Sequence, residues 1–231
     1  MTSWPNRELD LKMAAHLKLD YTRKHQETHT FVSISREYGC DGKAFAKALV
    51  KLLNEKEKDQ ECPWMVFDRD ALLQVADPSE IDEQSLGLLD EYGHSEFAGY
   101  IQEAIFRHKN QFQVIQNLAN ITRMLARRGH AVFVGRGATV LTQDIEGGLH
   151  FRLYAPLEWR VQNHAKRWSL DTSAARQRVE ENQKQRESFV KTYLSMPIDR
   201  PSLYDMMFNN AKVSAEQAAQ LAFALKKAKQ K

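Results

Sequence analysis

The clearest candidate for chemistry is a short glycine-containing stretch, Glu37-Tyr38-Gly39-Cys40-Asp41-Gly42-Lys43-Ala44, which follows a β-type run at 31–35. A helical pattern begins directly after it, so the stretch is predicted to be a loop between a strand and a helix. Such a loop binds phosphate when its N–H groups point inward, its glycines allow close approach and a lysine reaches the outer phosphates. Residues 38–44 are therefore candidates for binding nucleotide phosphates, with Lys43 as the catalytic candidate.

The loop keeps only part of the phosphate-loop pattern G-x-x-x-x-G-K-[ST]. Gly42 and Lys43 match its end, whereas Glu37 replaces the first glycine and Ala44 replaces the final hydroxyl residue. That hydroxyl normally ligates the Mg²⁺ ion that bridges the phosphates, so here water or other groups must hold the metal. A turn that serves only the fold is the alternative, because a tight strand-to-helix turn also favours glycine.

Charged residues follow two further apolar runs. Asp68 ends the run at 64–67, where its carboxylate either faces a ligand or caps the next helix. Arg136 lies between two glycines after the run at 131–134, where an arginine has little use in packing. A ligand-binding role is therefore predicted for Arg136, and both roles stay open for Asp68.

A basic helical region extends over about 160–190. Arg160 and Arg167 are seven residues apart, which places them on one helix face with His164 between them. Guanidinium groups match phosphate oxygens in geometry and charge. The pair is predicted to face the same cleft as the loop, and a solvated basic face is the alternative.

Strands alternate with helices along the chain, which predicts an α/β fold of three layers with a mainly parallel sheet. The expected strands lie at 31–35, 64–67, 131–134, 149–154 and 204–208. A block of helical spacing at about 78–128 forms a helical insertion, and a last helix begins at Ser214. Residues 1–30 form a helical extension that packs on the core or on a second subunit, so a homodimer is possible.

Composition narrows the class of protein. The chain has 231 residues, of which 42% are hydrophobic and 27% charged, the balance of one soluble globular domain. A net charge of +3 is too small to predict a polynucleotide partner, and no leader or membrane span is predicted. Cys40 and Cys62 are too few for a disulfide framework, so a cytoplasmic location is expected.

The loop and its surroundings resemble the cytidylate kinase-like family. The resemblance rests on the string Ser33-Ile34-Ser35-Arg36-Glu37-Tyr38-Gly39 followed by Gly42-Lys43, which is more specific than a general phosphate loop. Similar segments continue at 66–68, 134–138, 154–160 and 203–206, so the likeness covers roughly 31–227. It implies the P-loop NTPase-type fold of nucleoside monophosphate kinases for residues 31–231.

The resemblance also implies an activity, which is ATP-dependent phosphoryl transfer to a nucleoside monophosphate, with CMP or dCMP as acceptor and Mg²⁺ arriving with ATP. It makes the block at 78–128 the acceptor-binding insertion and 160–190 a basic lid. The residues implied to stabilise the transferring group are Lys43, Arg160 and Arg167. Those implied to bind the acceptor are Asp68, Arg136 and Arg186.

Departures from the family leave the function open. Relatives carry an Asp-x-x-Arg pair in the lid, and here Arg186 remains while Gln183 stands at the Asp position. A neutral amide holds an arginine more weakly than a carboxylate does. Together with Ala44 and Cys40, this allows an active kinase, a weak or inactive nucleotide-binding regulator, or a kinase with another small acceptor.

Two further patterns suggest chemistry outside this scheme. Cys40 lies near a predicted helix N-terminus, where the pKa of a thiol can fall and oxidation becomes possible. His25 and His29 have the i, i+4 spacing of a metal-binding pair, but a surface helix explains them without a third ligand. No metal is therefore assigned to histidine.

Overall fold

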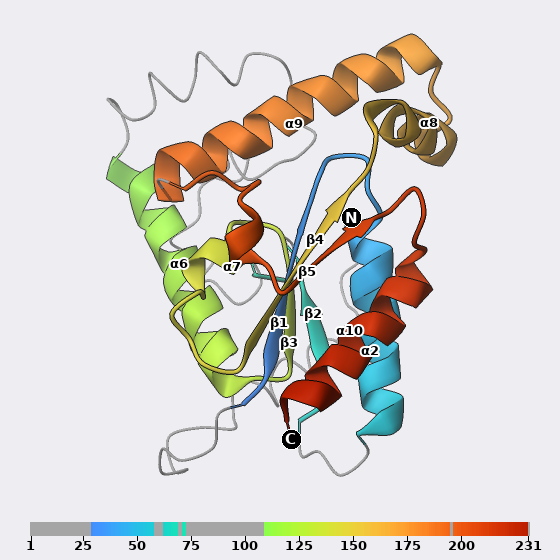
Figure 1. Cartoon of the computed structure of the whole chain (residues 1–231). Coiled ribbons are helices and arrows are strands. Elements are labelled where there is room, and N and C mark those ends of the chain that lie inside the picture. Colours follow the sequence, from blue (N-terminus) through green and yellow to red (C-terminus); the bar gives the residue numbers. More distant parts are fainter. Residues whose placement is uncertain (1–28, 58–61, 69–70, 73–108, 195, 231) are drawn as a thin grey trace, which may run out of the picture.

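A parallel β-sheet lies at the centre of the computed structural model, which describes residues 29–57, 62–68, 71–72, 109–194 and 196–230. Its five strands have the order β2-β3-β1-β4-β5, and every neighbouring pair is parallel (Figure 1). The strands are β1 (Phe31–Arg36), β2 (Met65–Phe67), β3 (Ala131–Val134), β4 (Gly148–Tyr154) and β5 (Met206–Asn209).

The central strands are buried on both faces, as their apolar runs predict. Every residue of β1 and of β3 is buried. In this register Ile34 of β1 is paired with Val134 on one side and with Phe151 of β4 on the other. Because the strands run the same way, their carboxyl ends meet at one edge of the sheet, where ligands of open α/β sheets bind.

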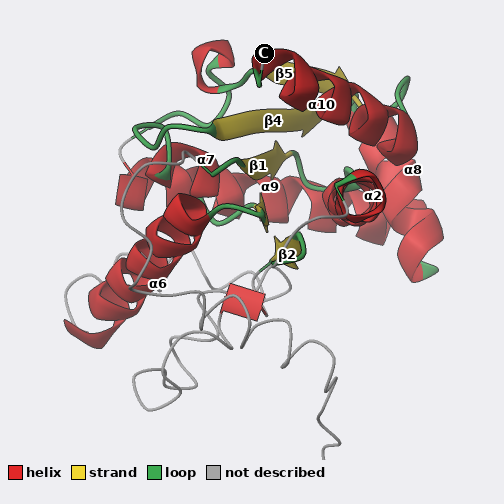
Figure 2. Ribbon diagram, turned by 90° about the horizontal axis from the view of Figure 1, so that it is seen from below, coloured by secondary structure: helices red, strands yellow, loops and turns green. Residues whose placement is uncertain are grey.

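Helices cover both faces of the sheet, so the three-layer α/β prediction is confirmed. On one face lie α2 (Gly42–Lys56) and α10 (Ala215–Lys229), and on the other α6 (Lys109–Arg128) and α7 (Ala138–Leu141) (Figure 2). Phe45, Leu49 and Leu53 recur every four residues on the buried face of α2. The buried residues of α10 are mostly alanines, which let it pack closely on α2.

Two basic helices, α8 (Leu157–Trp168) and α9 (Thr172–Leu194), follow β4, and α9 crosses the carboxyl edge of the sheet (Figure 1). The chain reverses at Ser169, which has a φ of 52°. Asp171 then accepts hydrogen bonds from the N–H groups of Ser173 and Ala174. Asp171 thus caps the start of α9 and separates it from α8.

The last strand differs from the sequence prediction, and the predicted insertion is only partly described. β5 covers Met206–Asn209 rather than 204–208, because a 3₁₀ turn, η2 (Pro201–Leu203), fixes the residues just before it. Of the insertion predicted at 78–128, the structure describes α6. The predicted extension at 1–30 lies outside the described residues except for its last two positions, so the domain boundary stays a prediction.

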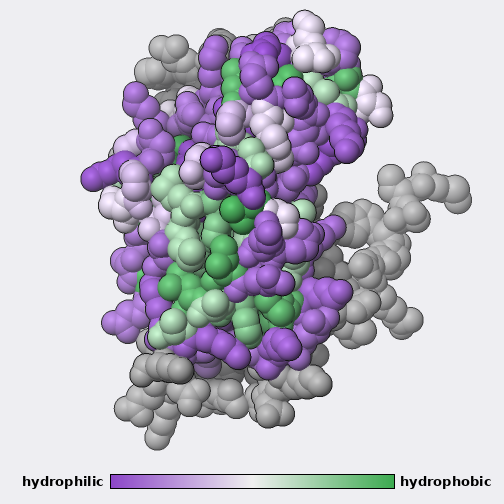
Figure 3. Space-filling model, turned by 45° about the vertical axis from the view of Figure 1, so that its right-hand side comes forward, coloured by the Kyte–Doolittle hydropathy of each residue, from purple (hydrophilic) through white to green (hydrophobic). Residues whose placement is uncertain are grey.

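The surface of the described residues is mainly polar, with a local apolar area on the face that Figure 3 brings forward. None of the described helices is long and apolar enough to cross a membrane. The exposed large apolar side chains of the described residues are Met124, Tyr154, Trp168 and Leu221. Such areas can form contacts between subunits, and the homodimer stays a prediction.

Candidate functional site

The predicted phosphate loop, residues 37–44, connects β1 to α2 at the carboxyl edge of the sheet. Gly39 has a φ of +93°, and a Cβ atom there would lie 2.8 Å from the Cβ of Arg160. Glycine is therefore required at 39 both for the backbone conformation and for the close approach of α8. Because α2 begins at Gly42, the first N–H groups of this helix have no acceptor within the helix.

Glu37 occupies the place of the first glycine of the phosphate-loop pattern and acts as an anchor of the loop. Its Oε2 accepts a hydrogen bond of 3.0 Å from the Ala155 N–H and lies 3.3 Å from Nε of Arg160. The buried Arg152 lies 3.9 Å from its other oxygen. The loop is therefore fixed to β4 and α8 by a carboxylate that a glycine could not supply.

Side chains from distant elements already bind two N–H groups of the loop. The Tyr38 N–H donates to Oε1 of Gln183 on α9 at 2.7 Å, and the Asp41 N–H donates to Oδ1 of Asn210 at 2.7 Å. The Asp41 carboxylate also accepts hydrogen bonds from Asn163 and Arg167. A phosphate that binds to these groups must displace protein contacts first.

Arg160, His164 and Arg167 lie on α8 beside the loop, but in different environments. Arg160 is buried and donates to the carbonyl oxygens of Ala155 and Tyr38, so it supports the loop backbone. His164 is buried against the Tyr38 ring, and burial lowers its pKa first, with Arg178 and Arg167 adding to the effect. Arg167 is the exposed member, and the roles of both arginines at a phosphate stay predictions.

Lys43, at the start of α2, and Asp68, just after β2, form an ion pair. Lys43 Nζ lies 2.9 Å from Oδ2 of Asp68, which follows β2. The other oxygen of Asp68 accepts a hydrogen bond from the Ala71 N–H, so the residue also caps the helical turn that follows. The cap predicted for Asp68 is therefore present, and its ligand-facing role stays a prediction.

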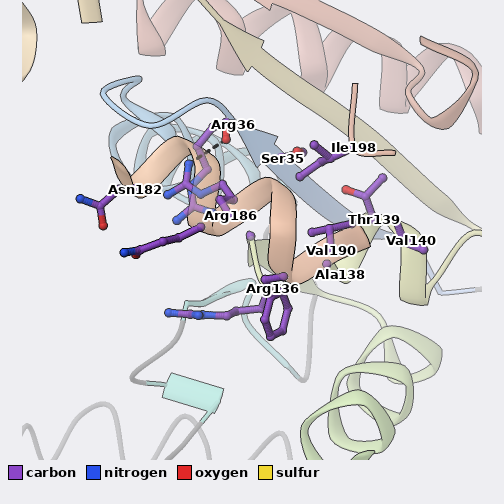
Figure 4. Close-up of a pocket in the computed structure, with 14 residues that line it drawn as sticks. Ser35, Arg36, Arg136, Ala138, Thr139, Val140, Asn182, Arg186, Val190 and Ile198 are labelled. Atoms are coloured by element: carbon purple, nitrogen blue, oxygen red, sulfur yellow. Dashed lines mark hydrogen bonds between the residues drawn. The ribbon is translucent and has the colours of Figure 1, made fainter. Parts of the chain in front are cut away.

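A pocket, here called the arginine pocket, opens beside the loop at the same edge of the sheet. Arg36 of β1, Arg136 after β3 and Arg186 of α9 line it, and the described lining residues include neither Asp nor Glu. Figure 4 shows these arginines on one side of the pocket and the aliphatic Val190 and Ile198 on the other. This distribution of side chains suits an organic phosphate, because the arginines can bind the phosphate group and the apolar side chains can contact the organic group.

Arg136 has an unusual backbone. Its φ is +55°, and its neighbours Gly135 and Gly137 have φ values of +78° and +68°. A non-glycine residue in the left-handed region is strained, and strain of this kind is concentrated at functional sites. The turn therefore favours the ligand-binding role predicted for Arg136.

Arg186 contacts the backbone of β1 and the ring of Tyr38. Its Nη1 donates to the carbonyl oxygen of Arg36 at 2.8 Å, and its guanidinium lies 5.4 Å from the centre of the Tyr38 ring. Gln183, at the former Asp position, binds the loop instead. The substitution therefore links α9 to the loop and leaves Arg186 at the pocket.

The environment of Cys40 contradicts the suggestion of a reactive thiol. Burial, followed by the charge of Glu37, raises the pKa of Cys40 to about 12. The thiol therefore stays protonated and unreactive at neutral pH. The apolar surroundings outweigh the effect of the nearby helix N-terminus.

The described residues offer little to a resident metal ion. No three His, Cys, Asp or Glu side chains among them come together as ligands. Ala44 supplies no oxygen, and Asp68 is the carboxylate beside Lys43. The Mg²⁺ ion expected with ATP stays a prediction.

Several contributors to the site had no role in the sequence prediction. Arg36 is the last residue of a central parallel strand, at the edge of the sheet where ligands bind. Its position could therefore have been recognised from the sequence. Asn163 and Asn210 contact the loop from more than 120 positions away, and no local pattern marks them. Gln183 was noted only for its place beside Arg186, and its contact with the loop was not predicted.

Comparison with known proteins agrees with this geometry. The model of the cytidylate kinase-like family matches residues 31–212. No curated protein matches the sequence. A solved structure of an uncharacterized protein from Eubacterium ventriosum is 17% identical, with a TM-score of 0.57 over 87% of this chain and 99% of that chain. A dephospho-CoA kinase from Campylobacter jejuni is 14% identical, with a TM-score of 0.34 over 86% and 96% of the two chains.

The likeness to the Eubacterium protein supports the α/β fold, and the family match covers most of the chain and contains the loop, the Arg136 turn and both basic helices. The chain therefore belongs to the cytidylate kinase-like family.

Proposed function

We propose that the protein transfers the γ-phosphoryl group of ATP to a nucleoside monophosphate, with CMP or dCMP as the acceptor. The observation that carries this proposal is the arginine pocket beside a lysine-containing phosphate loop. Phosphoryl transfer requires that the protein hold two phosphates close together and stabilise the negative charge on the transferring group. The loop, with Lys43, and the pocket, with its three arginines, are two adjacent places where phosphate groups could be held.

The roles follow from this arrangement. Lys43 and the first N–H groups of α2 bind the outer phosphates of ATP, and Arg167 exchanges Asp41 for a phosphate oxygen. Arg136 and Arg186 bind the acceptor phosphate in the pocket. Mg²⁺ enters with ATP and reduces the charge on its phosphates.

The test is a calorimetric binding screen of ATP, ADP, CMP, dCMP and the other monophosphates, with and without Mg²⁺, followed by an assay of ADP formation. Lys43→Ala should lose ATP binding, and Arg136→Ala should lose the binding of one monophosphate. The other monophosphates in this screen also test for a kinase with a different acceptor. A protein that binds nothing at the loop and phosphorylates no monophosphate would contradict the proposal.

A second candidate is a weak or inactive nucleotide-binding regulator. It is favoured by the contacts of Gln183 and Asn210 with loop N–H groups and by the missing hydroxyl at Ala44. Ala44→Ser, alone and together with Gln183→Asp, separates the two candidates in the same assay. A gain of ADP formation supports a kinase whose activity has been weakened. No ADP formation together with intact ATP binding supports the regulator.

A further inference from the structure

We infer that Arg36 binds the phosphate of the acceptor at the point where the phosphate loop meets the arginine pocket. The inference rests on the proposed function and deepens it, because no role was assigned to Arg36 there. Its ligand is a phosphate monoester, whose dianion suits three guanidinium groups around one pocket.

The path of the Arg36 side chain connects the two parts of the site. A Cβ atom on Gly42 would lie 3.2 Å from Cγ and Cδ of Arg36, so the aliphatic stem lies against the first residue of α2, next to Lys43. A Cβ atom on Gly135 would lie 1.8 Å from Nη1 of Arg36. The guanidinium therefore occupies room that exists only because residue 135 is a glycine.

Arg36 is also held in place before any ligand binds. Its carbonyl oxygen accepts the hydrogen bond from Arg186, and its backbone continues β1 beside Leu153 of β4. Although the residue is only 8% exposed, it lines the pocket. A buried, fixed cation loses little freedom when an anion binds, which strengthens the interaction.

The neighbouring cations identify the kind of ligand. Arg36, Arg136 and Arg186 come from β1, from the turn after β3 and from α9, and Figure 4 shows them around the same side of the pocket. Guanidinium groups that line one pocket offer several N–H donors in the planar geometry that phosphate oxygens accept. On the other side, Val140, Val190 and Ile198 provide apolar contacts for the organic part of the acceptor.

Calorimetry without ATP tests the inference, with CMP, inorganic phosphate and cytidine as the ligands. Arg36→Met keeps a stem against Gly42 and removes the guanidinium, and Arg36→Lys restores a positive charge. CMP and phosphate should bind roughly 10- to 100-fold more weakly to Arg36→Met, with partial recovery in Arg36→Lys and unchanged cytidine binding. Arg127→Gln, which removes an exposed arginine of α6, is the matched control and should bind like wild type.

Thermal unfolding shows whether each variant is folded. If Arg36→Met does not fold, Arg36→Lys decides, because it should bind CMP about tenfold more weakly through the loss of the bidentate fork. Unchanged CMP binding in the folded variant overturns the inference, and so does an equal loss for CMP and cytidine, or a wild-type protein that binds neither CMP nor phosphate.

The inference and the proposed function can fail separately. Turnover of CMP by wild type together with normal CMP binding by Arg36→Met overturns the role of Arg36 and keeps the kinase. Loss of CMP binding in Arg36→Met, in a protein that produces no ADP, supports the role of Arg36 and contradicts the kinase.

Discussion

The phosphate loop and the arginine pocket are neighbours, but their charges are balanced in different ways. In the loop, each charged side chain has a protein partner: Glu37 pairs with Arg160, Asp41 with Arg167 and Lys43 with Asp68. In the pocket, three arginines line one cavity, and the described lining residues contain no acidic side chain. An anion at the loop must therefore exchange existing ion pairs, whereas the pocket brings guanidinium groups from three elements to one cavity.

The largest effect is expected from Lys43, which shows whether the loop acts in catalysis despite its paired charges. Lys43→Ala should lower kcat about 100- to 1000-fold, because a preorganised cation no longer stabilises the transferring group. The measurement is steady-state ADP formation with CMP. Lys51→Ala removes an exposed lysine two turns further along α2 and should leave kcat unchanged. Equal values of kcat for Lys43→Ala and wild type would show that Lys43 does not take part in catalysis.

Glu37 tests whether the paired charges stabilise the fold. Glu37→Gln leaves Arg152 and Arg160, whose side chains are 4% and 11% exposed, without their carboxylate. The free energy of unfolding should fall by about 3 kcal/mol in urea titrations. Glu158→Gln breaks the exposed pair with Arg176 and should change stability little. Similar losses in both variants would mean that the buried Glu37 network stabilises the fold no more than an exposed ion pair does.

Cys40 tests the burial of the loop through pH. Burial raises the pKa of this thiol to about 12, whereas an unfolded chain has a thiol pKa of about 8.5. Between these values the unfolded state releases a proton that the folded state keeps, so stability falls as pH rises, by up to about 1.4 kcal/mol per pH unit.

Urea titrations from about pH 8 to 10 measure this slope, which should become shallower in Cys40→Ala. Cys62, whose pKa burial raises to about 11, contributes in the same direction, so Cys62→Ala provides a comparison outside the loop. Identical slopes for wild type and Cys40→Ala would show that the loop thiol is accessible to water.

The smallest effect is expected from Asp41, which tests whether the existing contacts compete with ATP. Asp41→Asn removes a negative charge from the loop and releases Arg167, so ATP should bind roughly 5- to 10-fold more tightly in calorimetry. Glu146→Gln, an exposed change after α7, should leave the affinity unchanged. Weaker ATP binding to Asp41→Asn would instead mean that the Asp41 contact holds the loop in its binding conformation.

Much of this arrangement could be predicted because parallel strands carry their following residues to one edge. Asp68, Arg136 and the loop each follow an apolar run, so the sequence alone places them together. The family likeness added Arg186, which no local pattern distinguishes from the other basic residues of its helix.

The remaining contacts depend on tertiary packing and could not be predicted. From the sequence, Glu37 was only a missing glycine, because its partners lie on β4 and α8. Arg160 and Arg167 lie on one face of α8, yet Arg160 near its start is buried and Arg167 in its last turn is exposed. The raised pKa of Cys40 likewise comes from burial that helix position does not reveal.

The contact between Asp41 and Asn210 has a consequence for how the site forms during synthesis. The two residues are 169 positions apart, as are Glu57 at the end of α2 and the buried Lys226 of α10. A ribosome releases the loop long before these partners, and contacts of such high sequence separation form slowly. A nascent chain that carries the whole loop should therefore still lack the contacts that fix the loop and α2 until β5 and α10 have joined the sheet.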